Sequence, residues 1–289
     1  MSFVEEEIAS QPACWRRAAA LATRLSAALP ARGRRVALVG CGTSLFIAQS
    51  IAALREAAGH GETDAFAASE VPPGRRYDVV MTLSRSGTTS EVLAAAEAFV
   101  ESPTVAITAV GSAPLAARTD RAIVLDFVDE HSLVQTRFAT TVFALVRAHI
   151  GQSIELAAAD AEDALEAPLP DPPAGSVVFL GTGWRVGLAR EAALKVREAA
   201  ALPTEAHPAL EFRHGPISAA DRSTLVWALG PIPSALAADI ERTGATLERA
   251  SRDPLAELVR VQRFAVRAAI AAGRDPDDPP HISRSVVVP

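Results

Sequence analysis

The sequence contains only two cysteines among its 289 residues, Cys14 and Cys41. Two isolated cysteines provide neither a disulfide framework nor a CxxC pair of metal ligands. The chain also lacks a block of basic residues, and its formal net charge is −6. We therefore expect neither nucleic acid nor an anionic membrane surface as its main partner. A small anionic substrate would need a local pocket rich in positive charge or N–H donors.

Long apolar runs are missing as well. No stretch of about 18 apolar residues is present that could span a membrane. The first residues, Met1 to Glu7, are acidic and carry no apolar secretory core, so we expect no signal peptide and a cytoplasmic protein. Apolar residues make up 49% of the chain, which suits helices packed over a buried sheet, and the length is comfortable for two domains.

One turn of the chain is unusually rich in hydroxyl groups. It follows an apolar run, Tyr77–Leu83, that predicts a buried strand, and precedes a run, Glu91–Val100, that predicts a helix. The N–H groups and the positive dipole end of a helix favour a phosphate-sized anion, and Gly87 lets the backbone approach it closely. One hydroxyl would suffice to cap the helix, and no Gly-Lys-Ser/Thr follows to make a nucleotide P-loop. The hydroxyl residues are Ser84, Ser86, Thr88, Thr89 and Ser90.

Strands and helices alternate along the first half. Such alternation predicts a parallel sheet covered on both faces, and these sheets bind ligands at the carboxyl ends of their strands. Gly40–Ser44 and Ser84–Thr89 both follow strands, so we expect them to face one pocket. The patterning predicts helices at Gln11–Leu29, Leu45–Ala58 and Ser132–Ile150, and further strands at Arg35–Val39, around Phe66, at Thr104–Thr108 and at Ala122–Asp126.

The same pattern begins again after residue 150. A shift of 141 residues places Gly40 on Gly181 and Gly42 on Gly183. We therefore predict a duplicated chain with two domains, 1–150 and 151–289. The third glycine of a dinucleotide motif is missing from both halves, which argues against NAD. The second half has predicted helices at Ile154–Glu166 and Trp184–Ala201 and predicted strands at Ser176–Leu180 and Ser223–Leu229.

The second half carries titratable residues where the first has its hydroxyl turn. Glu191, Lys195 and Glu198 are spaced four and three residues apart, so they share one face of a helix. By spacing alone we interpret Glu191 and Lys195 as a solvent-exposed ion pair.

A second group of titratable residues follows that helix. Their density between Pro203 and Pro216 favours a rigid turn that tunes pKa values for proton transfer, although His214 could equally be an ordinary loop histidine. No HxxxH or HExxH spacing is present, so we predict no metal site. The group comprises Glu205, His207, Glu211 and His214.

Several motifs occur in an order that resembles the sugar isomerase (SIS) domain family. The likeness is greatest to the isomerase part of glucosamine-6-phosphate synthase and to relatives that isomerise or deaminate amino-sugar phosphates. It covers essentially the whole chain and implies an α/β fold of two SIS domains. Each would be a three-layer αβα sandwich with a mostly parallel, flavodoxin-like sheet. The motifs are Cys41-Gly42-Thr43-Ser44, Ser84-x-Ser86-Gly87-x-Thr89, Ala193-Leu194-Lys195-x-x-Glu198, Glu211-Phe212-Arg213-His214-Gly215-Pro216 and Ile282-Ser283-Arg284-Ser285-Val286-Val287.

The resemblance implies a role for each matching residue. Glu198 would move a proton between C1 and C2 of a sugar, and His214 would assist ring opening, reaching in from the neighbouring subunit of a homodimer with shared active sites. Lys195 and Glu205 would lie in the same pocket. Such aldose–ketose chemistry needs a carboxylate near two adjacent carbons and a fixed phosphate, and no cofactor. The substrate phosphate would be held by Ser44, Ser84, Ser86 and Thr89, with Thr43 and Arg85 beside them.

Three departures from the family pattern matter. Arg284 stands where the synthase tail has a lysine, and an arginine cannot form a Schiff base, so Arg284 would position or neutralise. Arg85 replaces a glutamine in the phosphate loop, where it either adds charge at the phosphate or faces solvent. The chain has no glutaminase segment with a nucleophilic cysteine after the initiator Met, so we do not expect glutamine-dependent transfer.

These observations together favour a cofactor-independent, metal-independent enzyme of amino-sugar metabolism. The reaction we predict converts a 2-amino-2-deoxyhexose 6-phosphate, such as glucosamine 6-phosphate, into a ketose 6-phosphate and ammonia. Three alternatives stay open. They are a simple aldose–ketose phosphosugar isomerase, a fructosamine-6-phosphate deglycase and a non-catalytic sensor that binds a sugar phosphate.

Overall fold

Two parallel sheets form the framework of the chain. The computed structural model describes residues 2–99 and 101–287. The first sheet has the order β2-β1-β3-β4-β5 and the second the order β7-β6-β8-β9, and all neighbouring strands within each sheet are parallel. The predicted α/β class and flavodoxin-like order are therefore confirmed. The strands are β1 (Val36–Gly40), β2 (Thr63–Ala67), β3 (Val79–Leu83), β4 (Thr104–Thr108), β5 (Arg121–Val124), β6 (Val177–Gly181), β7 (Thr204–Pro208), β8 (Leu225–Ala228) and β9 (Thr246–Arg249).

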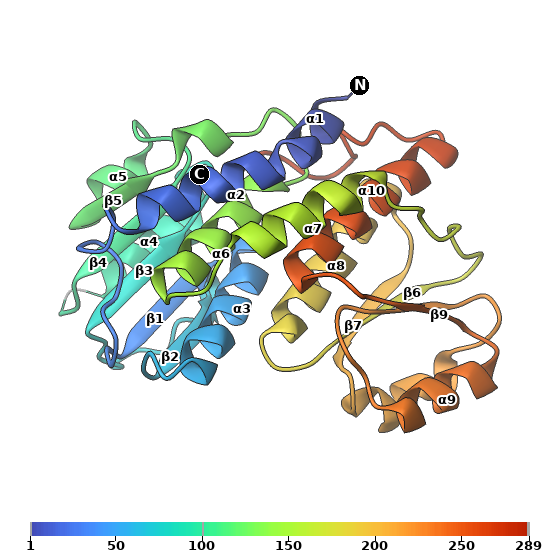
Figure 1. Ribbon diagram of the computed structural model, residues 1–289. Helices are drawn as coiled ribbons and strands as arrows, with labels where there is room; N and C mark the ends of the chain where they lie inside the picture. The colour runs from blue at the N-terminus through green and yellow to red at the C-terminus, as the bar shows by residue number, and fades with distance from the viewer. Residues whose placement is uncertain (1, 100, 288–289) are drawn as a thin grey trace.

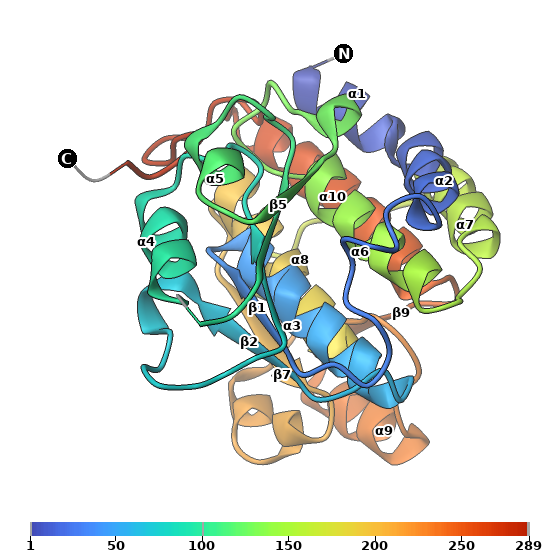
Figure 2. The ribbon, with the colours of Figure 1, turned by 90° about the vertical axis from the view of Figure 1, so that its left-hand side faces the viewer.

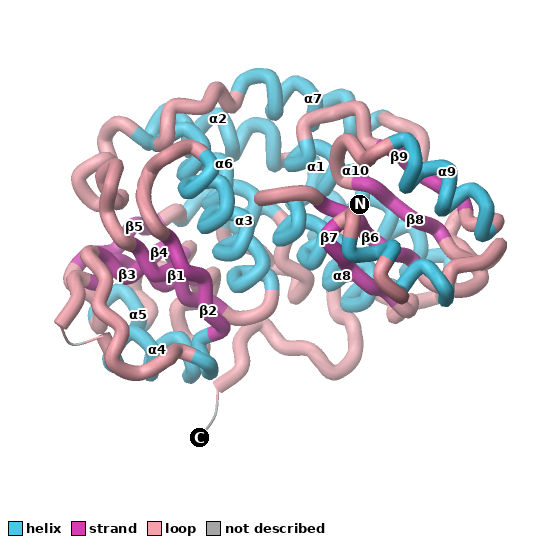
Figure 3. Tube along the Cα trace, turned by 90° about the horizontal axis from the view of Figure 1, so that it is seen from below, coloured by secondary structure: helices cyan, strands magenta, loops and turns pink. Residues whose placement is uncertain are grey.

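Helices lie between the sheets and on their outer faces. Figures 1 and 3 show the two sheets on opposite sides of a helical layer that includes α3, α6 and α8. Figure 2 shows α4 and α5 on the other side of the first sheet, which completes three layers. The helices are α1 (Phe3–Ala9), α2 (Gln11–Ala22), α3 (Thr43–Ala57), α4 (Ser90–Ala98), α5 (Pro114–Ala117), α6 (Arg137–His149), α7 (Glu155–Glu166), α8 (Arg185–Ala200), α9 (Ser234–Thr243) and α10 (Pro254–Ala271), with short 3-10 turns η1 (Ala68–Glu70), η2 (Asp126–Val128), η3 (Glu211–Arg213) and η4 (Pro216–Ala219).

The apolar strand runs are explained by burial on both faces. In β1, Val36 and Leu38 join a core that reaches from one sheet to the other, whereas Ala37 and Val39 join a separate core beneath α4. The same alternation divides β6 between the shared core and a core beneath α9. A strand covered on both faces needs apolar residues at every position, which is why the strands are readable in the sequence.

The two halves meet where α3 packs against α8. These are the corresponding helices of the predicted repeat, and each follows a glycine with positive φ, +54° at Gly42 and +56° at Gly183. Gly187 permits the close packing, because a Cβ there would lie 2.5 Å from the carbonyl oxygen of Phe46 and would also collide with Ser50. This crossing brings the start of α3 beside α8.

Several predicted boundaries are wrong. The helix predicted to end at Leu29 ends at Ala22, and the helix predicted to begin at Ser132 begins at Arg137. The rigid turn predicted between Pro203 and Pro216 contains the edge strand β7. Helix α4 ends at Ala98, and Val100, where we predicted its end, lies outside the described residues.

The domain boundary at residues 150 and 151 stays a prediction. Within the described parts of the chain, none of the helices has the length and apolar character needed to cross a membrane.

Candidate active site

Two helix-starting turns meet at the carboxyl ends of neighbouring strands. Gly40 at the end of β1 pairs in register with Leu83 at the end of β3, so the turns that follow lie side by side. Both contribute to one cavity of about 260 Å³, as the sequence predicted. The cavity is lined by Cys41, Gly42, Thr43, Thr89, Leu133, Gln135, Lys195, Glu198 and the tail segment His281–Val286.

The hydroxyl turn is held in shape by its own side chains. Ser84 Oγ accepts the N–H of Gly87 at 3.1 Å, and Ser86 Oγ accepts the N–H of Thr88 at 3.3 Å. Gly87 has φ +65°, and a Cβ there would lie 2.6 Å from the Cβ of Ala113, so only glycine fits. These contacts fix the shape of the turn, and Thr89, the residue before α4, lines the cavity.

Helix α8 brings an ammonium group and two carboxylates to the opposite wall. Lys195 Nζ lies 2.5 Å from Glu198 Oε2, 2.8 Å from Thr43 Oγ1 and 3.6 Å from Glu191 Oε1. The side chains of Lys195 and Glu191 are each 1% exposed, and that of Glu198 is 20% exposed. Our interpretation of Glu191 and Lys195 as a solvent-exposed pair is therefore wrong, because α3 and α10 pack on α8.

Burial shifts the pKa values of Glu191 and Lys195, and so determines which of the two carries a charge. Desolvation raises the pKa of Glu191 to about 8, and the nearby Lys195 ammonium offsets only part of that effect. Burial also disfavours the charged form of Lys195, but the carboxylates of Glu191 and Glu198 outweigh it and raise the pKa of Lys195. Near neutral pH Glu191 is therefore mostly protonated and Lys195 is charged, so the cluster does not repel an incoming anion.

Six other predicted site residues are not among those that line the cavity. Ser84 and Ser86 are buried within the hydroxyl turn. Ser44 is buried in the first turn of α3. Arg85 is also buried, which rules out the solvent-facing alternative, and its guanidinium pairs with Glu130. Glu205 lies on the edge strand β7 with its side chain 54% exposed and bonds to His207, and His214 is exposed after η3. Neither Glu205 nor His214 lines the cavity, so this chain alone does not bring them to Lys195.

The tail lines the cavity, and the Arg284 side chain is bound to the segment before α6. The guanidinium of Arg284 donates to the carboxylate of Asp129 and to the carbonyl oxygen of Glu130. Thr88 Oγ1 lies 2.9 Å from Ser285 Oγ, and the N–H of Ser90 donates to the carbonyl of Val286 at 3.1 Å. The tail is thus fixed to the hydroxyl turn and to the segment before α6.

Sequence reasoning missed the segment that supplies Leu133 and Gln135. We predicted a helix from Ser132, whereas residues 132–136 form a loop before α6. Gln135 lines the cavity, and no described group donates a hydrogen bond to its buried Oε1. A bound polar ligand could satisfy this oxygen. No motif in the sequence marks it.

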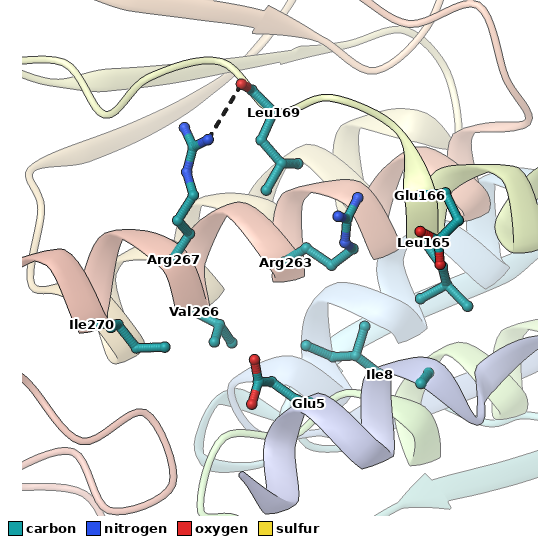
Figure 4. Close-up of a pocket in the computed structure, with 10 residues that line it drawn as sticks. Glu5, Ile8, Leu165, Glu166, Leu169, Arg263, Val266, Arg267 and Ile270 are labelled. Carbon is teal, nitrogen blue, oxygen red and sulfur yellow. Dashed lines mark hydrogen bonds between the residues drawn. The ribbon is translucent and has the colours of Figure 1, made fainter. Parts of the chain in front are cut away.

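A second cavity of about 400 Å³ lies between α1, α7 and α10 (Figure 4). Its floor is apolar, with Ile8 and Val266. The two arginines at its edge are occupied, since Arg263 donates to the carbonyls of Ala164 and Ala167, and Arg267 to that of Leu169. This cavity contains none of the predicted site residues. Among the residues described, no three His, Cys, Asp or Glu side chains are grouped so that they could hold a metal ion.

Comparison with known proteins shows which family and which folds the chain is similar to. Residues 31–149 match the model of the SIS domain family. Over 142 residues the chain is 30% identical to the glutamine–fructose-6-phosphate aminotransferase (isomerizing) of Neisseria meningitidis serogroup B, an alignment that covers 39% of this chain and 23% of that enzyme. The corresponding enzyme of Sulfolobus acidocaldarius is 26% identical over 295 residues, which is 88% of this chain and 50% of that enzyme. The chain thus spans at most about half the length of these relatives.

Solved structures extend the likeness to the whole fold. A glucosamine-6-phosphate deaminase from Thermotoga maritima superposes with a TM-score of 0.84 at 25% identity, covering 99% of this chain and 100% of that one. A tagatose-6-phosphate ketose/aldose isomerase from Escherichia coli superposes with a TM-score of 0.81 at 23% identity, covering 98% and 97%. The second likeness concerns the fold alone.

Proposed function

Residues 31–149 belong to the SIS domain family, and from this premise we propose that the protein is a phosphosugar isomerase and deaminase. It acts on an amino-sugar 6-phosphate, as in glucosamine 6-phosphate, and yields a ketose 6-phosphate and ammonia. One observation carries the proposal. The carboxylate of Glu198, held by the Lys195 ammonium at 2.5 Å, lines the same cavity as the two helix starts at Thr43 and Thr89.

The phosphate is bound at the start of α4 by neutral donors. Hydroxyl groups and helix N–H groups complement a phosphate dianion without a fixed counter-charge. The substrate phosphate contacts Ser86 and Thr89, with Ser84 shaping the turn through its bond to Gly87. A preformed turn costs little ordering on binding. The sugar chain then extends across the cavity toward α8.

Glu198 moves the proton. In the open-chain substrate it takes the proton from C2 while O1 is protonated, which gives an enolamine, and it returns the proton to C1. The product is a ketimine at C2, whose C=N bond water hydrolyses to a ketone with release of ammonia. Lys195 donates a hydrogen bond to the Glu198 carboxylate and holds it in place beside the cavity. These steps need only the substrate, water and the side chains described.

The homodimer with shared active sites also belongs to this proposal. His214 is exposed and lies outside the cavity of its own chain, which supports a role at a neighbouring subunit's cavity. Light scattering of the purified protein measures the subunit number. A strictly monomeric and active protein would remove His214 from the reaction.

A substrate panel separates the proposal from its alternatives. Purified protein is incubated with glucosamine 6-phosphate, galactosamine 6-phosphate, fructose 6-phosphate and a phosphorylated fructosyl amino acid, and ammonia, free amino acid and sugar products are measured. We expect ammonia from a hexosamine 6-phosphate. Free amino acid would identify a deglycase, and aldose–ketose exchange without ammonia would identify a simple isomerase.

Variants of Glu198 distinguish an enzyme from a sensor. Glu198→Gln should lower kcat by a factor of about 10² to 10⁴ and should still bind the sugar phosphate. Glu241→Gln alters an exposed carboxylate on α9 that pairs with Arg249 and serves as the matched control. If native protein releases no ammonia from any hexosamine 6-phosphate, the proposed reaction is wrong.

A further inference from the structure

Arg85 and Glu130 form an ion pair sealed inside the protein. Arg85 Nη1 lies 3.3 Å from Glu130 Oε2, and the two side chains are 1% and 0% exposed. Arg85 belongs to the hydroxyl turn between β3 and α4, whereas Glu130 lies between η2 and α6. Removing one partner of such a pair leaves a buried charge uncompensated. The pair therefore couples two segments that both border the cavity.

Glu130 organises the loop before α6. Its Oε1 accepts the N–H groups of Thr136 at 2.5 Å and Arg137 at 2.8 Å, and the hydroxyl of Thr136 at 3.0 Å. These groups lie at the start of α6, so the carboxylate also compensates the positive end of that helix. Arg85 Nη1 donates in addition to the carbonyl of Ser132 at 3.1 Å. The Arg85–Glu130 pair is thus bonded to both ends of the loop that carries Leu133 and Gln135 into the cavity.

The same guanidinium holds the tail. Arg85 Nη2 donates to the carbonyl oxygen of Arg284 at 3.2 Å. The Arg284 side chain returns to Asp129 and to the Glu130 carbonyl. The hydroxyl turn, the loop before α6 and the tail therefore meet at one buried arginine. Arg85 itself is not among the residues that line the cavity.

We propose that Arg85 is a positioning residue, which fixes the loop before α6 and the tail over the cavity through Glu130 and the Arg284 carbonyl. It does not bind the substrate phosphate. Both of its Nη atoms are bound to protein groups, and its Nε is buried with no hydrogen-bond partner among the described residues. The phosphate would then be bound by the neutral donors of the turn. Arg85 and Arg284, the two arginines that depart from the family pattern, belong to one hydrogen-bond network. The kinetic part of this inference rests on the proposed function.

The test compares Arg85→Gln, Glu130→Gln and the double variant, in which neither charge is buried. Arg260→Gln is the matched control, because Arg260 pairs with the fully buried Glu257 on α10 beneath the second sheet. Affinity is measured with inorganic phosphate by calorimetry. Release of the tail is measured as the rate at which trypsin cleaves after Arg284, followed by mass spectrometry. The values of kcat and KM are measured with glucosamine 6-phosphate.

For a positioning residue we expect Arg85→Gln and Glu130→Gln to keep phosphate affinity within twofold. Both should accelerate cleavage after Arg284 at least tenfold and lower kcat at least tenfold, while Arg260→Gln changes none of these. The fold-loss of kcat in the double variant should be smaller than the product of the fold-losses in the two single variants, because no unpaired charge remains. If Arg85→Gln alone fails to fold, the neutral double variant carries the same comparison.

Two results would overturn the inference. A tenfold loss of phosphate affinity in Arg85→Gln but not in Glu130→Gln would make Arg85 a phosphate ligand. Cleavage after Arg284 that is no faster in either variant than in Arg260→Gln would show that the pair does not hold the tail. Both readouts are independent of turnover, so they stand even if the protein releases no ammonia.

Discussion

Lys195 Nζ lies 2.8 Å from Thr43 Oγ1, and this bond joins the two halves of the chain inside the candidate site. Thr43 opens α3, which follows β1 of the first sheet, and Lys195 lies on α8, which follows β6 of the second. The two helices correspond in the predicted repeat. However, α3 contributes its first turn to the cavity, whereas α8 contributes a face with charged side chains. The bond thus places the start of α3 and the charged face of α8 in one cavity.

Thr43→Val tests this bond directly. Valine keeps the shape of threonine and removes the acceptor, so the buried ammonium loses one of its partners. A hydrogen bond to a charged group contributes about 1.5–3 kcal/mol. We expect unfolding to require roughly that much less free energy and kcat/KM to fall about tenfold. Urea unfolding and steady-state kinetics provide the two measurements, and unchanged values in both would contradict the assigned contact.

Gly187→Ala tests the packing that creates the site. The added methyl group would lie 2.5 Å from the Phe46 carbonyl and against Ser50, so α3 and α8 must move apart. Overpacking of this kind costs about 1–3 kcal/mol. We expect a lower denaturation midpoint and reduced activity, because the distance between Lys195 and Thr43 depends on this crossing. Gly183→Ala is less suitable as a control, since Gly183 has positive φ. Ala189→Gly, inside the same helix, reports the combined effect of helix propensity and of losing one buried methyl group, without a collision.

Most strands could be predicted from the sequence because both faces of each sheet are covered by helices. Strands such as β1 and β4 are short apolar runs with every residue buried, and turn residues bracket them. The edge strand β7 was not predicted, since Glu205, His207 and Pro208 read as a loop. An edge position tolerates proline and polar side chains, and its pairing with β6 comes from tertiary contact.

The site was only partly predictable for a similar reason. Spacing showed that Glu191, Lys195 and Glu198 share a helix face, but not that distant segments bury that face. No prediction was made for residues 234–271, which contain α9, β9 and α10, and α10 is one of the helices that cover α8. The role of Arg85 was likewise hidden, because its partner Glu130 lies in a loop that we interpreted as leading straight into a helix.

Substitutions in the hydroxyl turn test the phosphate site. Ser86→Ala and Thr89→Val each remove one neutral donor near the start of α4, so the KM for a phosphorylated sugar should rise by roughly tenfold per hydrogen bond. Binding of the unphosphorylated amino sugar should not change. The ratio of the two affinities is the readout, and an equal effect on both ligands would mean that the turn does not contact the phosphate.

Glu191→Gln tests the charge of the buried cluster. The pKa of Glu191 is raised from 4.5 to about 8 by burial, so between those values the unfolded chain binds fewer protons at this group than the folded protein. The native protein therefore loses stability from this group as pH rises from about 5 to 8, and the loss levels off above that range. A glutamine side chain cannot ionise. The free energy of unfolding of the variant should therefore rise relative to that of the native protein as pH rises through this range. The pKa is raised by about 3.5 units and one pKa unit corresponds to about 1.4 kcal/mol, so a gain on the order of 3–4 kcal/mol is expected between pH 5 and pH 8.

Denaturant unfolding of both proteins at pH 5, 6, 7 and 8 measures this difference, with Glu241→Gln as the exposed control. A second consequence concerns the substrate. Ionisation of Glu191 above pH 8 adds a negative charge beside Glu198, so the KM for a phosphorylated sugar should rise there in the native protein and stay flat in Glu191→Gln. The lysine remains charged over this range because its own pKa is raised by the two carboxylates. A stability difference that is constant from pH 5 to 8 would mean that Glu191 is already ionised in the folded protein.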